Sequence, residues 1–530
     1  MENSLEQKTS KNSANRQIAR AAGIVMAGFV LSNVTSLVRT ILTARVFGAG
    51  EVLDAFNAAQ RLPDILFNLV AGGALASAFI PTLTSFIEND DRRGGWELTS
   101  SIINLVIVVL TVVCALTWIF AEPVVGQFLA PKFSTHQQVL TVELLRIMLA
   151  APVIFGISGL LMGVLNTHQR FLLPALAPTL LWLGMIFGLL VFSPSIGIHG
   201  LAWGYGLGAL LHLLVQLPGV LRLPQRRYRL MLGLRLSAVR EVGRLMAPRL
   251  LGVAVVQLNF LVNVIVGSGL PAGSLSAIDF AFRIMTMPQV VIAQAISIAA
   301  LPTFSAQIAR GRPDEMRASL ASTLRGILFL SLPATLGLIL LRRPVIAMLY
   351  EGGEFGARDT QMVAWALLWY TIGLVGHSLV EILSRAFYAM HDTRTPVVIG
   401  VGTMSLNVLF SFTFPAWFTS RGWLPHGGLA LANTLATGLE MVVLLVIMRR
   451  RLDGLRGGFI WRGTLKSFLA TAAMSAAVLG WLAWAGMLNP WIVGLGGIAV
   501  GGAVYVILMF VLRVEEMGVF VNYLRNRLRS

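Results

Sequence analysis

Residues 106–120 read VIVVLTVVCALTWIF, a run that contains no charged side chain. Backbone polar groups cannot stay unpaired in hydrocarbon, so a run of this kind crosses a bilayer as a helix. Comparable runs recur along the 530-residue chain, and many exceed the ~18 residues that mark a transmembrane helix. Strands of a membrane barrel alternate in polarity and do not produce such runs. The sequence therefore predicts an all-α polytopic membrane protein.

The composition agrees with this class. Hydrophobic residues make up 56% of the chain, charged residues 12%, and the mean hydropathy is +0.77. A soluble protein would carry about 25% charged residues. The formal charge of +17 would suggest nucleic-acid binding in a soluble protein, but here it is typical of basic cytoplasmic loops. We expect no nucleic-acid partner, and the single cysteine, Cys114, excludes an internal disulfide.

The hydropathy pattern predicts about fourteen spans. Their centres lie near Val34, Leu69, Leu110, Ile154, Leu181, Leu207, Val255, Val291, Leu330, Leu374, Leu406, Leu439, Ala473 and Val504. Basic residues gather in the even-numbered connections, which the positive-inside rule assigns to the cytoplasm. The exception is the connection after the ninth span, which holds Arg342, Arg343 and Arg358. The richest connection holds Arg222, Arg226, Arg227, Arg229, Arg235 and Arg240, and the C-terminus holds Arg525, Arg527 and Arg529. We therefore expect a multi-pass protein of a bacterial cytoplasmic (inner) membrane with both termini in the cytoplasm.

Two pairs of segments indicate an internal repeat. DAFNAAQRLP (54–63) parallels DFAFRIMTMP (279–288) at an offset of 225 residues. LNTHQRFLLP (165–174) parallels FYAMHDTRTP (387–396) at an offset of 222. Transporters built from repeats bind their substrate between the halves, often at broken helices. The repeat predicts two lobes of about six spans each, followed by two further helices.

The predicted organisation divides the chain at its basic connections. In chain order it comprises a cytoplasmic N-terminal tail (1–22), an N-lobe (23–222), a basic cytoplasmic linker (223–243), a C-lobe (244–450), two extra helices (464–513) and a cytoplasmic tail (514–530).

Several charges occur inside or beside apolar runs. The stretch 37–68, LVRTILTARVFGAGEVLDAFNAAQRLPDILFN, contains Arg39, Asp54 and Arg61, and Arg283 lies in the eighth span. A charge at the centre of a membrane helix costs ~2.5–3.5 kcal/mol, so such residues usually face a cavity or a partner. Arginine makes bidentate bonds with phosphate oxygens, which suits an anionic ligand.

Two structural alternatives stay open. Arg39 could snorkel toward the headgroups, and Arg61 could pair with Asp54 or Asp64 for stability alone. Ser32 and Asn33 are polar residues of the first span that either contact a ligand or bond between helices.

Motifs of enzymes are missing from the sequence. It contains no P-loop, no His-Glu-x-x-His and no cysteine cluster. We therefore expect a protein that is not an enzyme and that holds no cofactor. A coupling ion or the membrane potential would supply the energy for transport. The membrane potential supplies ~2.3 kcal/mol per charge per 100 mV.

Six stretches together resemble one family. They are 38–66 (VRTILTARVFGAGEVLDAFNAAQRLPDIL), 72–83 (GGALASAFIPTL), 163–181 (GVLNTHQRFLLPALAPTLL), 300–305 (ALPTFS), 349–359 (LYEGGEFGARD) and 385–397 (RAFYAMHDTRTPV). They resemble the MviN/MurJ family of lipid II flippases within the MOP exporter superfamily.

The resemblance implies a fold and a function. It implies fourteen helices in two lobes, a groove for the lipid tail beside the last pair, and transport of undecaprenyl-pyrophosphate-linked glycopeptide to the outer leaflet for peptidoglycan synthesis. It implies functional roles for Arg39, Arg283 and Asp54, with Ser32 at the usual serine of span one. By this resemblance the partner is lipid II, and the basic inner loops would attract anionic membrane lipids.

The chain departs from the family pattern at three positions. Asn33 and Phe67 stand where arginines are usual, and Thr286 stands where an acid is usual. Alternative functions are therefore a flippase for another polyprenyl-linked oligosaccharide, a cation-coupled drug exporter, a polyprenyl-phosphate glycosyltransferase or a membrane scaffold. The basic residues disfavour a drug exporter for cations, and the short outer loops disfavour a glycosyltransferase.

Overall fold

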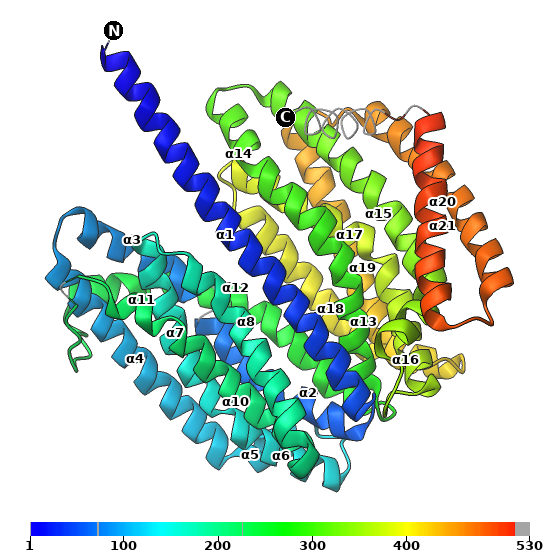
Figure 1. The fold of residues 1–530 in the computed structure, drawn as a ribbon, viewed down its shortest axis with the longest axis horizontal. Helices are drawn as coiled ribbons and strands as arrows, with labels where there is room; N and C mark the ends of the chain where they lie inside the picture. The colour runs from blue at the N-terminus through cyan, green and yellow to red at the C-terminus, as the bar shows by residue number, and fades with distance from the viewer. Residues whose placement is uncertain (1, 71–73, 225, 513, 515–530) are drawn as a thin grey trace. The chain divides into compact units, whose positions relative to one another are not determined.

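The computed structural model describes residues 2–70, 74–224, 226–512 and 514, and the regular elements in these ranges are helices, with no strand among them (Figure 1). The side chains of residues 2–22 and nearly all of the predicted cytoplasmic tail 514–530 lie outside this description. Contacts divide the chain into two compact units, Met1–Gly269 and Leu270–Ser530.

Unit 1 consists of helices joined mostly by short turns. It contains α1 (Glu2–Phe47), α2 (Glu51–Val70), α3 (Ala74–Glu88), α4 (Arg92–Ile119), α5 (Ala121–Pro123), η1 (Val124–Leu129), α6 (Thr135–Met148), α7 (Ala150–Thr167), α8 (Leu172–Phe187), η2 (Gly188–Phe192), α9 (Ser193–Ile196), α10 (Ile198–Leu214), α11 (Leu217–Leu221) and α12 (Ser237–Gly267).

Unit 2 follows the same plan and adds a terminal helix pair. It contains α13 (Ser274–Gln289), η3 (Val290–Gln294), α14 (Ala295–Ala309), α15 (Pro313–Tyr350), α16 (Ala357–Ile372), α17 (Leu374–Ala389), α18 (Arg394–Ser420), α19 (His426–Arg451), α20 (Gly457–Ala485) and α21 (Pro490–Val511). The last two helices lie side by side and both pack on α15 (Figure 1).

The all-helical membrane fold predicted from the sequence is confirmed. Among the described residues, eleven helices are long and apolar enough to cross a membrane, and the bent pair α16–α17 raises the number to twelve. The predicted spans near Leu69 and Val255 fall on α2–α3, which is interrupted by residues outside the description, and on α12, whose apolar part is Val256–Gly267. Fourteen spans are consistent with this arrangement.

Backbone conformations show the internal repeat more clearly than side chains do. Left-handed residues recur at offsets of 221 to 225 residues, because each marks the same turn in both halves. The pairs are Gly48 with Gly273, Asp90 with Gly311, Gln169 with His391, and Gly197 with Gly422. The apolar cores match as well: one lies mainly among α3, α4 and α7, and the other among α14, α15, α17 and α19.

Helix α12 belongs to the second repeat by its order in the chain but to unit 1 by its contacts. In element order, α12 is the first helix of the second repeat and corresponds to α1. It packs against α2, α3 and α4 and is therefore part of unit 1, whereas α1 packs against α8. The lobe boundaries predicted at residues 222 and 244 stay a prediction.

Glycines allow α8 and α10 to approach closely. A Cβ atom added to Gly208 would lie 2.4 Å from the carbonyl oxygen of Leu181, whereas one added to Gly206 would meet no atom within 4 Å. Small residues at helix contacts are typical of membrane proteins, in which packing rather than water drives association. The spacing of glycines in α10 therefore sets one helix–helix distance.

The segment around Asp392 connects three helices of unit 2. Its carboxylate accepts hydrogen bonds from the Thr395 backbone nitrogen (2.9 Å) and the Thr395 hydroxyl (2.5 Å), and Arg451 of α19 lies 2.5 Å away. The Arg451 guanidinium also lies over the Phe387 ring of α17. The D-T-x-T-P motif at 392–396 thus caps the start of α18 and ties it to its neighbours.

We expect Gly208→Ala to lower the free energy of unfolding by about 1–3 kcal/mol, because α8 and α10 must separate to admit the methyl group. Thermal unfolding in detergent measures the effect. Gly206→Ala is the matched control on the same helix and should not lower the midpoint. Equal midpoints for the two variants would contradict this account of the α8–α10 contact.

The hydrogen bonds from Thr395, together with Arg451, lower the pKa of Asp392 from 3.8 to about 2. Because the folded-state pKa is depressed, the ionised carboxylate stabilises the fold above pH 3.8, and this contribution disappears as the pH falls toward 2. Asp392→Asn should therefore lower the unfolding midpoint at neutral pH, with native and variant curves converging in acid. A difference that persists unchanged near pH 2 would contradict the assignment.

Candidate functional site

The polar side chains of α2 form one face of that helix. Asp54, Asn57, Arg61, Asp64 and Asn68 follow one another at spacings of three and four residues, which places them in one stripe. Asp54 lies in the first turn and is only 2% exposed. A carboxylate in the first turn interacts favourably with the helix dipole. The helix therefore carries polar and charged side chains along one face.

Side chains from α10 and α12 meet this polar face. The Tyr205 hydroxyl donates a hydrogen bond of 2.9 Å to Oδ1 of Asp64. The Arg61 guanidinium lies 5.2 Å from the centre of the Phe260 ring, a cation–π distance. Pro63 lies within α2 between these two contacts. Asp64 and Arg61 are thus each engaged by an aromatic residue of another helix.

Trp182 of α8 brings together two of the predicted residues of α1. Its indole nitrogen donates a hydrogen bond of 3.2 Å to the Ser32 hydroxyl, and the Arg39 guanidinium lies 5.2 Å from its ring centre. Arg39 is 5% exposed. The snorkelling alternative is therefore not the arrangement observed, because an arginine that snorkels exposes its charged end.

Asn33 does not join this group. Its side-chain amide donates to the Phe29 carbonyl oxygen of the same helix at 2.8 Å, and the residue is exposed. Phe67 packs its ring against Phe155 of α7 with centroids 4.6 Å apart. At both positions where the family usually has arginine, the side chain therefore serves local packing or bonding.

In unit 2 the predicted arginine has an acidic partner. Nε of Arg283 donates to Oδ2 of Asp279 at 2.7 Å, one helical turn away on α13. Both side chains are about one-third exposed, at 34% and 30%. Thr286 donates its hydroxyl hydrogen bond to the Arg283 carbonyl oxygen. The pair lies just before Pro288 and the π-helical turn η3, where the helix geometry changes.

Sequence reasoning missed Trp182, Tyr205 and Phe260. Each is an aromatic residue in an apolar helix far along the chain from its partner, and aromatic residues of membrane helices give no signal of a specific contact. Asp64 does carry a signal in the sequence, because acidic residues within membrane spans are rare. From the sequence we consider it only as a structural partner of Arg61. Among the described residues, no group of three or more His, Cys, Asp or Glu could hold a metal ion.

Comparison with known proteins gives consistent matches. Residues 43–498 match the family model described as "Lipid II flippase MurJ". The chain is 32% identical to a lipid II flippase MurJ of Burkholderia cenocepacia, over 88% of this chain and 91% of that protein. It is 31% identical to a probable lipid II flippase MurJ of Bdellovibrio bacteriovorus, over 87% of each chain.

Solved structures agree at the level of the fold. A lipid II flippase MurJ in an inward closed conformation superposes with a TM-score of 0.79 at 23% identity, covering 93% of this chain and 99% of that one. An inward-facing multidrug resistance MATE transporter of the MOP superfamily gives a TM-score of 0.66 at 15% identity, covering 80% and 96%.

The geometry around Trp182 makes a stability prediction. Trp182→Leu removes the cation–π contact and the Ser32 hydrogen bond, and should lower the free energy of unfolding by about 2–3 kcal/mol. Trp182→Phe keeps an aromatic face and should cost about 1 kcal/mol. Trp203→Leu, at a residue 55% exposed on α10, is the control. Thermal unfolding in detergent measures the series, and a loss as large at Trp203 as at Trp182 would contradict a specific contact.

Proposed function

The chain belongs to the MurJ family of lipid II flippases, and from that premise we propose that it carries lipid II across the cytoplasmic membrane by alternating access. The headgroup would move from the inner to the outer leaflet, and the lipid tail would stay in the bilayer. The family match spans residues 43–498, so it covers both repeats. The observation that carries the mechanism is the burial of Arg39, a membrane-span arginine that is 5% exposed and held over Trp182.

Arg39 is suited to bind one phosphate of a diphosphate. A guanidinium that rests on an aromatic face directs its N–H groups outward in its own plane, which is the direction of bidentate phosphate binding. The contact with Trp182 also restricts the side chain before a ligand arrives. A restricted donor loses less conformational entropy on binding. Ser32 assists indirectly because it fixes the indole.

Arg283 would act by exchanging partners. The ion pair with Asp279 at 2.7 Å compensates its charge in the absence of cargo. A diphosphate offers two or more anionic oxygens and replaces a single carboxylate oxygen at the guanidinium. Asp279 then faces the transported anion, and its repulsion favours release at the other side of the membrane. The partial exposure of both side chains is compatible with such an exchange.

The remaining predicted site residues have supporting roles. Asp54 and Arg61 share the polar face of α2, on which they would contact sugars or the phosphate. Pro63 and Pro288 interrupt the hydrogen bonding of their helices and would supply the bending that alternating access requires. Asn33 is an exposed residue that would reach cargo only after leaving its bond to Phe29. No enzymatic step is part of this function.

Location and energy supply complete the proposal. The basic connections support an inner-membrane protein with both termini in the cytoplasm and with anionic lipids near its inner face. The energy would come from the membrane potential or a coupling ion. Moving one net charge through 100 mV supplies ~2.3 kcal/mol.

Two observations favour a second candidate. Asn33 and Phe67 replace cations that the family usually places near the headgroup, and neither side chain compensates for them. A polyprenyl-linked oligosaccharide with a smaller negative charge would need fewer cations. The fold is shared with multidrug exporters, but Arg39, Arg61 and Arg283 disfavour a cationic cargo.

The deciding experiment measures lipid II at the outer face. A host depleted of its own flippase expresses the native chain, Arg39→Ala, Arg283→Ala or Arg283→Lys, and an external enzyme cleaves exposed lipid II. We expect cleavage with the native chain and a loss of about tenfold to a hundredfold for either alanine variant, since a charge-assisted bidentate bond is worth about 1.5–3 kcal/mol. Arg283→Lys keeps the charge and should lose less.

The matched control is Arg312→Ala. Arg312 pairs with Glu315 within α15 at 2.9 Å but lies at an exposed position, so its loss should leave cleavage unchanged. Normal cleavage by Arg39→Ala and Arg283→Ala would sink the diphosphate-binding role. No cleavage from the native chain, despite normal amounts in the membrane, would favour the second cargo.

A further inference from the structure

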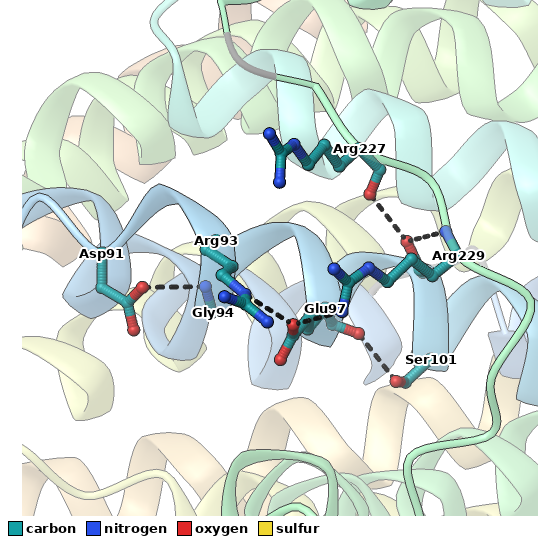
Figure 2. Close-up of polar contacts among 8 residues, drawn as sticks. Asp91, Arg93, Gly94, Glu97, Ser101, Arg227 and Arg229 are labelled. Carbon is teal, nitrogen blue, oxygen red and sulfur yellow. Dashed lines mark hydrogen bonds and ion pairs between the residues drawn. The ribbon is translucent and has the colours of Figure 1, made fainter.

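An extended segment of unit 1 lies along the first turns of α4. Residues 226–236, which we call the strap, connect α11 to α12 and have no helical structure. Figure 2 shows the strap passing Ser101 and Glu97 of α4, with Arg227 and Arg229 on either side of the contact. The strap is a well-defined part of the unit because its backbone is bonded to α4.

Side chains of α4 satisfy the backbone of the strap. The Ser100 hydroxyl accepts from the Arg229 backbone nitrogen at 3.2 Å and lies 3.5 Å from the Arg227 carbonyl oxygen (Figure 2). The Asn104 amide donates to the carbonyl oxygens of Arg229 (2.9 Å) and Met231 (3.0 Å). The Tyr228 hydroxyl donates to the Asn104 side-chain oxygen.

An ion pair adds to these bonds. Nη1 of Arg229 lies 2.9 Å from Oε1 of Glu97, which Arg93 also contacts at 3.2 Å (Figure 2). Asn104 itself is 6% exposed and Ser100 is fully buried. Buried polar groups of this kind are costly to leave unpaired, so the strap and α4 hold each other in place.

The position of these contacts on α4 gives the depth of the strap. From Ser100 to Ile119 the helix extends roughly 30 Å at 1.5 Å per residue, which equals the hydrocarbon thickness of a bilayer. Trp118 and Phe120 at the far end are exposed, as expected for the opposite interface. The strap, which bonds to residues 100 and 104, therefore lies level with the near edge of the hydrocarbon.

Half of the eight exposed residues of the strap are apolar or aromatic, and the other half are arginines. Leu230 is 93% exposed, Leu234 58%, Tyr228 57% and Leu232 41%. In water such exposure would be unfavourable at ~25 cal/mol per Å². At the edge of the hydrocarbon the same side chains reach acyl chains.

Arginines lie at both ends of this apolar run. Arg226, Arg227 and Arg235 are exposed and form no ion pair with any residue that the structure describes. Three cations without an ion pair to a described residue, at the edge of the hydrocarbon, are complementary in charge to anionic phospholipid headgroups. Aliphatic side chains with arginines are typical of segments that lie in a membrane interface.

We propose that the strap is an interfacial anchor that binds anionic phospholipids, with Leu230 and Leu234 among the acyl chains and Arg226, Arg227 and Arg235 at the headgroups. The bonds from Ser100, Asn104 and Glu97 hold the backbone at this depth. This inference concerns the lipids around the protein and is independent of the cargo that the protein transports.

Site-specific fluorescence tests the depth. In a Cys114→Ser background, Leu230→Cys carries an environment-sensitive fluorophore, and the protein is placed in nanodiscs whose lipids are brominated on the acyl chains. We expect strong quenching at position 230. Asn89→Cys, in the exposed turn between α3 and α4, is the control and should be quenched little. Equal quenching at both positions, or none at 230 as expected for a surface that binds a soluble protein, overturns the proposal.

The lipid preference is tested with the bromine on one lipid class at a time. At fixed composition, brominated phosphatidylglycerol should quench position 230 more than brominated phosphatidylcholine. Each arginine near the surface should enrich anionic lipid locally by about fivefold. Replacing Arg226, Arg227 and Arg235 together by Gln should therefore remove the difference in quenching between the two lipids. A preference that survives in this variant overturns the role of the arginines.

Asn104→Leu should release the strap and reduce quenching at 230, and the arginine variant keeps the test decisive if Asn104→Leu does not fold.

Discussion

The absence of hydrogen-bond partners in hydrocarbon controls this structure. Backbone polar groups at membrane depth must find their partners within the protein, so the backbone forms helices, and several polar side chains are paired as well. Asp64 bonds to Tyr205, Ser32 to Trp182, and Arg283 to Asp279. Even the connection between α11 and α12 obtains its bonds from Ser100 and Asn104. The charged side chains of the candidate site thus take part in the same kind of pairing that stabilises the fold.

The sequence predicted the parts of the fold that depend on long patterns. Apolar runs give the helices, and the offset of 222 residues between two motifs gives the repeat, which the left-handed residues Gln169 and His391 confirm. The candidate site was predicted only in part. Charges in apolar runs indicate Arg39 and Arg283 as candidates. The cation–π contact of Arg39, however, is with an aromatic residue of another helix, and the periodicity of a sequence does not show which helices are in contact.

Helix α12 illustrates a second limit. Its place in the order of elements assigns it to the second repeat, yet its contacts are with α2, α3 and α4. Repeats share a folding pattern because their turns and cores match, but the first helix of each has a different neighbour.

The ion pair on α13 also has a consequence for the synthesis of the protein. Arg283 and Asp279 lie one turn apart on the same helix, so α13 can enter the bilayer with its charges already compensated. Each alone would add ~2.5–3.5 kcal/mol to the cost of insertion at the centre of a span. The pair therefore lowers the cost of inserting α13 into the bilayer during translation, before the protein meets any lipid-linked cargo.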